Sequence, residues 1–181
     1  MSQKFAFIDV ETTGLDIEQH ELLEVGCVVA RNGGASGEMS LEVVEEFESK
    51  IKPEHIERSD PEALRVNRYN ETEWLFASEP KPALEQLVRV SKDAIMVAHN
   101  LSFDFAFLDR AFLRYEVESK LHRHKIDTLS IAHAKLFSKG EADKLSLSYL
   151  CKRFGITNER AHTALADARA TMEVYEKLMN M

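Results

Sequence analysis

The sequence predicts an α/β fold, with a mixed sheet covered by helices, from three observations. Two strand-like segments, 4–10 and 22–31, come first, and Asn32-Gly33-Gly34 follows as a turn signal. Further along, short apolar segments alternate with segments whose apolar residues recur at helical spacing. A hairpin followed by alternating strands and helices is typical of a mixed sheet, and ligand sites in such sheets gather at strand ends.

The first half of the chain is expected to supply three strands. KFAFIDV (4–10) is short, mostly apolar and rich in aromatic and β-branched residues, so it predicts a buried strand. LLEVGCVVAR (22–31) predicts a second strand, and 39–51 a third that forms a hairpin with it. The segment 53–92 is polar and is expected to be mainly helical.

The second half is expected to return to the sheet once and to cover it with helices. AIMVAH (94–99) predicts a short buried strand, and 103–117 a helix with one apolar face. Gly155 is expected to cap a short helix that ends before it. The remaining helices are expected at 127–137, 145–154 and 163–179.

The composition fits one globular domain, 1–181, with one core. No apolar run approaches the roughly 18 residues needed to span a bilayer. The first residues lack the apolar stretch of a signal peptide, so we expect a cytoplasmic protein with no membrane contact. Cys27 and Cys151 each lie in an apolar pattern and are expected to be reduced, buried thiols.

The net charge of −8 argues against a polyanionic partner, because nucleic-acid binders usually carry a basic surface. The objection weakens if several carboxylates hold divalent cations, since bound metal reverses the local field. The charge then indicates modest affinity for long nucleic acid, or help from a partner protein.

Asp9 and Glu11 lie two residues apart at the end of the first expected strand, so both side chains share one face. Two carboxylates on one face repel each other unless a cation neutralises them. The structural alternative is a polar strand end exposed to water. For this pair alone, the two interpretations are equally supported.

Asp104 stands near the start of the expected helix 103–117, after a strand that ends at His99 and Asn100. A carboxylate near a helix N-terminus is electrostatically favoured, so Asp104 also has a purely structural explanation. For His99 we favour a packed histidine. For Asn100 a loop-turning role is at least as well supported as a substrate contact.

His162 and Asp167 lie five residues apart, which is about 140° of net rotation on one continuous helix. They would then point to different faces, whereas a His162 in the loop before the helix can turn toward Asp167. Asp167 lies beside the buried face of the tail helix, where a lone acid requires a partner. The alternative is an exposed polar residue. The four acids together offer hard oxygen ligands, which suit Mg²⁺ or Mn²⁺ better than zinc.

Three segments resemble, in order and spacing, the motifs of the DEDDh (DnaQ-like) 3′→5′ exonucleases: FIDVETTGL (7–15), HNLSFDFAFL (99–108) and HTALADA (162–168). That group includes the proofreading subunit of bacterial DNA polymerase III and ribonuclease T. The segments 126–132 and 145–156 are also similar to the family, so the resemblance covers nearly the whole chain. It implies a ribonuclease H-like fold with a five-stranded mixed sheet flanked by helices. It also implies release of nucleoside 5′-monophosphates from single-stranded or frayed DNA.

The resemblance carries roles onto matching residues. Asp9, Glu11, Asp104 and Asp167 would hold two divalent cations, Mg²⁺ or Mn²⁺, and His162 would be the general base.

Substrate contacts are also carried over by the resemblance. The backbone at Thr12 and Thr13 would meet the terminal 3′-hydroxyl, with Asn100 nearby. Leu15 and Phe103 would wedge against the terminal bases, which stack on any apolar face. For Phe103 core packing is the favoured alternative, because a helical aromatic stripe usually marks a core.

Two alternatives remain open at this level. One is an RNA 3′-end trimmer or oligonucleotide exoribonuclease similar to ribonuclease T, which the segment 51–67 resembles, although no dense basic patch accompanies it. The other is a proofreading or binding subunit that serves a DNA polymerase. The expected partners are single-stranded DNA or RNA 3′ ends and, in the second case, a polymerase. The sequence leaves monomer and homodimer undecided.

Overall fold

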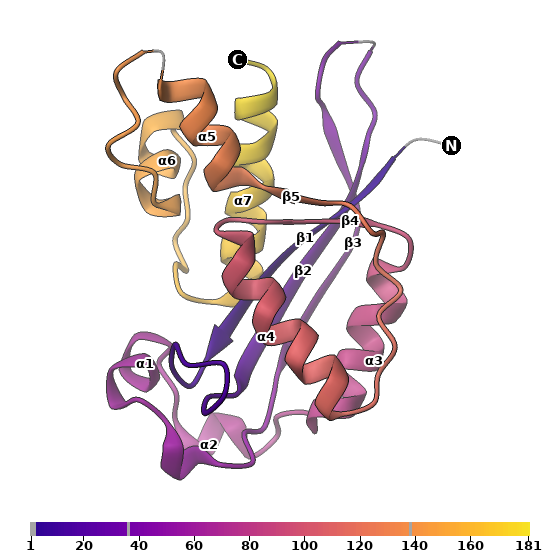
Figure 1. Cartoon of the computed structure of the whole chain (residues 1–181), viewed down its shortest axis with the longest axis vertical. Coiled ribbons are helices and arrows are strands. Elements are labelled where there is room, and N and C mark those ends of the chain that lie inside the picture. The colour runs from indigo at the N-terminus through magenta and orange to yellow at the C-terminus, as the bar shows by residue number, and fades with distance from the viewer. Residues whose placement is uncertain (1–2, 36, 138) are drawn as a thin grey trace.

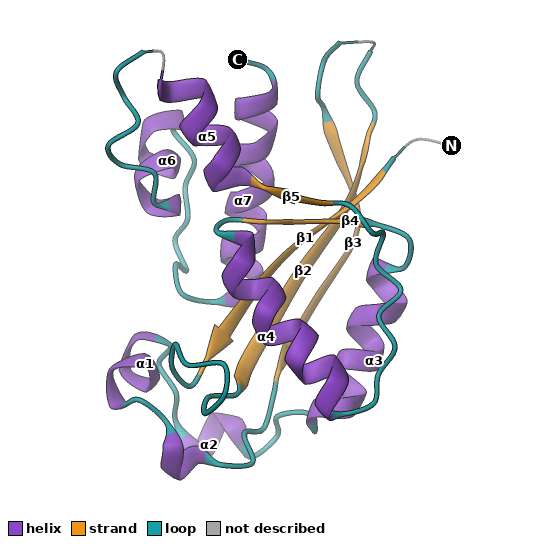
Figure 2. Cartoon of the chain, in the orientation of Figure 1, coloured by secondary structure: helices purple, strands orange, loops and turns teal. Residues whose placement is uncertain are grey.

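The structure is a computed structural model that describes residues 3–35, 37–137 and 139–181. Its strands and helices follow the expected order, with one short strand added before α5 (Figure 2). The strands are β1 (Lys4–Thr12), β2 (Leu22–Asn32), β3 (Leu41–Lys50), β4 (Ile95–Ala98) and β5 (Lys125–Asp127). The helices are η1 (Ile56–Arg58), α1 (Pro61–Val66), α2 (Glu71–Trp74), α3 (Pro80–Ser91), α4 (Leu101–Arg114), α5 (Thr128–Phe137), α6 (Leu147–Phe154) and α7 (Ala164–Met179).

The five strands form one mixed sheet in the order β3-β2-β1-β4-β5. β1 pairs antiparallel with β2, and β2 pairs antiparallel with β3, which confirms the predicted hairpin. On the other side of β1, β4 and then β5 pair in parallel. The predicted α/β fold with a five-stranded mixed sheet flanked by helices is therefore confirmed.

Helices cover both faces of the sheet, which explains why β2 is buried along nearly its whole length (Figure 1). α3 and α4 pack on one face, where Ile8 and Val10 of β1 meet Leu84 and Phe107. α7 packs on the other face, with α5 and α6 beside it.

α7 is fixed against the sheet by an aromatic cluster. The ring of Tyr175 lies 5.8 Å from that of Phe5 and 5.6 Å from that of Phe7, measured between centroids. Such tilted contacts add to the burial of apolar area. The helix therefore has a defined position, and its N-terminus lies near the carboxyl end of β1 (Figure 1).

The segment expected to be mainly helical, 53–92, is divided into four short pieces. Pro61 and Pro80 begin α1 and α3, as the missing amide of proline favours at a first helical position. The side chains of Asp60 and Asn70 cap α1 and α2. α1 and α2 lie beside the carboxyl end of β1 (Figure 1).

β3 is an outer strand of the sheet, and five of its ten residues are exposed while none is fully buried. It carries four glutamates within ten residues: Glu42, Glu45, Glu46 and Glu48. Arg169 of α7 pairs with Glu46 at 2.7 Å. Among the described residues, no helix is both long and apolar enough for a transmembrane span. Cys27 and Cys151 are free and buried, as expected.

Candidate active site

β1 delivers Asp9 and Glu11 to the face of the sheet that α7 covers. Phe5 and Phe7 lie on that face, and strand alternation continues the series to Asp9 and Glu11. The strand extends through Thr12, two residues farther than its apolar run predicts, so both acids belong to the strand itself.

Asp104 comes to the same place from the first turn of α4. Its side chain is 3% exposed, and its Oδ1 accepts a hydrogen bond from the backbone amide of Val10 at 3.0 Å. Val10 lies between Asp9 and Glu11 in the chain, so Asp104 lies directly against the strand that carries the first two acids. Its burial exceeds what a helix-capping role alone requires.

His162 lies in the loop before α7, as predicted, and its backbone takes a left-handed φ of 67°. The imidazole is exposed, whereas Asp167 is half-buried in the first turn of the helix. Glu11, His162 and Asp167 each present a ligand atom, and these atoms all lie within 4.8 Å of one another. Residues separated by about 150 positions along the chain therefore form one cluster.

The clustered acids change one another's protonation. Burial, followed by the charge of Asp104 and then Glu11, raises the pKa of Asp9 well above its usual range. Burial, followed by the charges of Asp167 and Glu24, raises the pKa of Glu11 to about 8. Burial raises the pKa of Asp104 to about 7, although two backbone amides oppose the shift. Such a group of carboxylates retains protons unless cations compensate its charge, and its oxygen donors fit hard divalent ions.

A fifth acid, Glu24, lies next to the cluster and was not singled out in the sequence. It faces Glu11 across the β1–β2 pair and is only 5% exposed. Burial raises its pKa to about 7, and its Oε1 accepts a hydrogen bond from the backbone amide of Ala164 at 2.8 Å. Glu24 therefore holds the N-terminus of α7 against β2. The sequence offered one signal for this role, since Glu24 is the only acid within the apolar run LLEVGCVVA.

Gly26 permits the same contact and was also missed. A Cβ added at this glycine would lie 2.2 Å from the backbone carbon of Ala164 and from the backbone nitrogen of Leu165. The backbone of α7 thus lies directly on β2 at this point. A glycine inside a strand often marks such a close backbone approach. Because Asp9 faces Gly26 in the strand register, this contact places the start of α7 beside the acids.

The end of β1 and the loop that follows it are fixed by hydrogen bonds from both sides. Thr12 and Thr13 are buried, and their carbonyls accept from Asn67 Nδ2 and the Asp60 amide, each at 2.8 Å. Thr13 also exchanges two bonds with the backbone of Glu21, each at 2.8 Å. Neither Asn67 nor Asp60 was singled out in the sequence. They give α1 a role in holding the predicted 3′-end contacts.

The other predicted substrate contacts differ in exposure. Leu15 is 78% exposed, so its side chain is available to a ligand. Phe103 is partly buried in the core and lies 4.9 Å from Phe107 between ring centroids, which supports its packing role. Asn100 is exposed and takes a left-handed backbone (φ 67°, ψ 53°), which supports its loop-turning role. The Nδ1 of His99 lies 3.0 Å from Thr128 Oγ1, as a packed histidine would.

Asp127 connects the ends of two elements near the site, a role that the sequence did not reveal. Its Oδ1 accepts from the amides of Asn100 at 3.0 Å and Leu101 at 3.2 Å, at the start of α4. Its two oxygens also accept from the amides of Leu129 and Ser130, each at 3.2 Å, in α5. Asp127 therefore helps to set where α4 begins and where Asp104 points.

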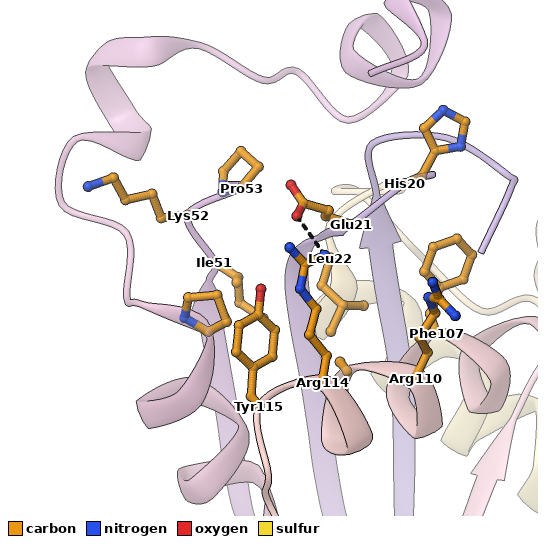
Figure 3. Close-up of a pocket in the computed structure, with 12 residues that line it drawn as sticks. His20, Glu21, Leu22, Ile51, Lys52, Pro53, Phe107, Arg110, Arg114 and Tyr115 are labelled. Atoms are coloured by element: carbon orange, nitrogen blue, oxygen red, sulfur yellow. Dashed lines mark ion pairs between the residues drawn. The ribbon is translucent and has the colours of Figure 1, made fainter. Parts of the chain in front are cut away.

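A hollow lies between the β1–β2 loop, the segment after β3 and α4 (Figure 3). Arg114 pairs there with Glu21 at 3.2 Å and with Glu54 at 2.6 Å. Glu21, Glu54 and His55 also form a group of closely spaced ligand atoms. Since the Arg114 guanidinium already neutralises two of these groups, the cluster anchors the loop after β1.

Comparison with known proteins agrees with this geometry. The model of the exonuclease family matches residues 6–175. A DNA polymerase III PolC-type protein of Thermotoga maritima is 31% identical over 182 residues, which cover 98% of this chain. A PolC-type protein of Staphylococcus aureus is 28% identical over 97% of the chain. The chain spans only 12% and 11% of the lengths of these two relatives.

Solved structures show the same fold. The nuclease domain of 3′hExo, a DEDDh family member bound to rAMP, superposes with a TM-score of 0.79 at 15% identity, covering 98% of this chain and 92% of that one. E. coli exonuclease I in complex with a dT13 oligonucleotide superposes with a TM-score of 0.77 at 20% identity, covering 97% of this chain and 41% of that one. The fold is therefore the ribonuclease H-like fold of these nucleases. The family match across residues 6–175 shows that the chain belongs to the exonuclease family.

Proposed function

We propose that this chain hydrolyses the 3′-terminal phosphodiester of single-stranded or frayed DNA and releases nucleoside 5′-monophosphates. The proposal depends on one observation: the charges of Asp104, Glu11 and Asp167 all act on Asp9, and ligand atoms of Glu11, Asp167 and His162 lie within 4.8 Å of one another. The preference for DNA is supported by the similarity to PolC-type DNA polymerases. We further propose that the described elements act together as one exonuclease domain.

The cofactors that we propose are two divalent cations, Mg²⁺ or Mn²⁺, held by Asp9, Glu11, Asp104 and Asp167. When bound, they supply positive charge that offsets the acids and the phosphate and that makes water a better nucleophile. Four carboxylates and two divalent cations balance in charge, so an acidic chain can accept a polyanion at this point.

His162 acts as the general base in this proposal. Its exposed imidazole accepts a proton from the attacking water, whose oxygen forms a bond to the phosphorus of the terminal nucleotide. The bond from phosphorus to the 3′-oxygen of the shortened strand breaks, and that oxygen takes up a proton. The backbone at Thr12 and Thr13, where β1 ends, holds the terminal 3′-hydroxyl, and Leu15 packs against the terminal base.

The test compares two acids on the same helix. Asp104→Asn keeps an oxygen that accepts from the Val10 amide but removes one carboxylate. We therefore expect the fold to be unchanged and the rate of hydrolysis to fall by at least about 1,000-fold. Asp109→Asn is the matched control, because Asp109 is exposed on α4. Its activity should remain within about twofold of the unmodified chain. Equal activity in both variants would contradict the proposed site.

The substrate assay uses 5′-labelled strands of one sequence as single-stranded DNA, as duplex DNA with a mismatched 3′ end and as RNA. Each is incubated with Mg²⁺, Mn²⁺ or EDTA. We expect a ladder that shortens from the 3′ end, nucleoside 5′-monophosphate as product, and no reaction in EDTA. Faster cleavage of RNA than of either DNA would favour the ribonuclease T-like alternative.

We also propose that a DNA polymerase presents the 3′ end to this chain, as the PolC-type relatives suggest. Size-exclusion chromatography with light scattering, with and without a replicative polymerase, tests the association. A shared peak supports it, and separate peaks at micromolar concentrations contradict it. The same measurement distinguishes a monomer from a homodimer.

A further inference from the structure

The loop before α7 is tied to one carboxylate at both of its ends. Asn158 Nδ2 donates to Asp167 Oδ1 at 2.5 Å, and the backbone amide of His162 donates to Asp167 Oδ2 at 3.1 Å. Asn158 is half-buried, and its side chain makes no other hydrogen bond within the described parts of the chain. The two bonds close the loop over Asp167.

Asp167 is the fixed end of this arrangement. Its helix is seated on β2 through Gly26 and is held by the bond from the Ala164 amide to Glu24. The loop, by contrast, has few internal bonds: Thr163 donates to the carbonyl of Arg160 from its amide at 3.1 Å and from its hydroxyl at 3.0 Å. The position of His162 therefore depends on what ties the loop to the helix.

His162 also needs such a constraint for its backbone. Its φ of 67° is left-handed, and a non-glycine residue is less stable in that region than in a right-handed conformation. The bond from its amide to Asp167 stabilises this conformation. The bond from Asn158 keeps the carboxylate in the orientation that accepts it.

We propose that Asn158 is a positioning residue that orients the Asp167 carboxylate and holds the His162 loop over the acids; this rests on the proposed function. A carboxylate has about four lone-pair sites, and the two loop bonds use one on each oxygen. One site on each oxygen thus stays available to a divalent cation. Hydrogen bonds of this kind from outside the ligand set orient carboxylates that bind metals.

The alternative role, a direct contact with substrate, is less consistent with the geometry. One N–H of the Asn158 amide already donates to Asp167, so this donor is occupied within the chain. Asn158, His162 and Asp167 line a hollow together with Ser146 and Cys151 of the α6 region. Loss of the bond would leave the loop free to move into that hollow.

The test measures Mn²⁺ binding directly, by the electron paramagnetic resonance signal of free Mn²⁺ during titration. Asn158→Leu keeps the size of the side chain but removes the donor, and Asn158→Ala removes both. The matched control is Glu159→Gln, since Glu159 is exposed in the same loop and its side chain makes no hydrogen bond in the described residues. Thermal unfolding of each variant checks that the fold is kept.

We expect both Asn158 variants to weaken Mn²⁺ binding by roughly 10- to 100-fold, as other residues that orient metal ligands do. They should also lower kcat while KM stays within about twofold, since a misplaced base affects the reaction more than substrate binding. Glu159→Gln should match the unmodified chain in both.

The outcomes separate this inference from the proposed function. If the unmodified chain binds Mn²⁺ no more tightly than Asp167→Asn does, the proposed metal site is wrong. If the unmodified chain binds Mn²⁺ tightly, Asp167→Asn does not, and both Asn158 variants bind as the unmodified chain does, then only the role of Asn158 is wrong.

Discussion

Replacing Gly26 by alanine tests whether the close backbone contact between α7 and β2 sets the geometry of the site. The added Cβ would lie 2.2 Å from the backbone of Ala164, whereas ordinary contact begins at 3.4 Å. The neighbours are backbone atoms, so no side chain can rotate away. The start of α7 must therefore move by about 1.2 Å relative to β2. That movement also stretches the bond from Ala164 to Glu24 and displaces Asp167 from the other acids.

Gly26→Ala should lower both the stability of the fold and the rate of hydrolysis, and the two losses can be measured separately. Overpacking of this kind lowers the free energy of unfolding by about 1–3 kcal/mol, which chemical denaturation measures. A displacement of about 1 Å in a catalytic group reduces the rate about 100-fold, which the 3′-end assay with Mn²⁺ measures at a temperature where Gly26→Ala is folded. The activity loss should therefore exceed what the fraction of unfolded protein explains.

Gly140→Ala is the matched control. A Cβ at Gly140 meets nothing within 4 Å, but its φ of 69° makes alanine strained there. This variant should lose stability without losing activity in its folded fraction. If Gly26→Ala keeps both its free energy of unfolding within about 0.5 kcal/mol and its rate within about twofold, α7 does not depend on this contact and the reasoning is refuted.

Three further predictions concern the charges around the site. Burial raises the pKa of Glu11 from 4.5 to about 8 and that of Asp104 from 3.8 to about 7, so the folded state binds protons more tightly than the unfolded chain. The contribution of these two groups to stability without metal should be largest below about pH 4 and should be lost as the pH rises toward 8; a denaturation series with and without Mn²⁺ should show the largest metal effect at pH 8. Glu24→Gln keeps an acceptor for the α7 amide but removes a buried negative charge, so it should unfold at a higher temperature than the unmodified chain at pH 8; Glu24→Ala, which loses the acceptor, should not. Asp127→Ala removes the acceptor for amides at the starts of α4 and α5 and should lower stability by about 2 kcal/mol with a drop in kcat, whereas Asp143→Ala, at an exposed acid, should change neither.

Periodicity predicted most elements because each is amphipathic or buried in a regular way. β1, β2 and α7 were placed to within two residues, since apolar runs and helical repeats fix them locally. β5 was not located from its own residues. Its three residues, Lys125–Asp127, are all only half-buried, and such a short pairing is determined by the neighbouring β4.

The candidate site divides in the same way. Five site residues lie in recognisable sequence motifs, and the structure brings them together: Asp9, Glu11, Asp104, His162 and Asp167. The residues that hold these five in place could not be predicted from local sequence patterns, because their hydrogen bonds join residues far apart in the chain. Glu24 accepts from the Ala164 amide, and Asn67 donates to the Thr12 carbonyl.

The outer strand β3 has a consequence for how this chain joins other molecules. An unpaired strand edge exposes amides and carbonyls that can recruit another strand. Here the glutamates along β3 make a second acidic strand unfavourable, and at the opposite edge β5 offers only three residues. Assembly with a larger machine should therefore use helices and loops, which leaves the strand register, and with it the spacing of Asp9 and Glu11, unaltered by association.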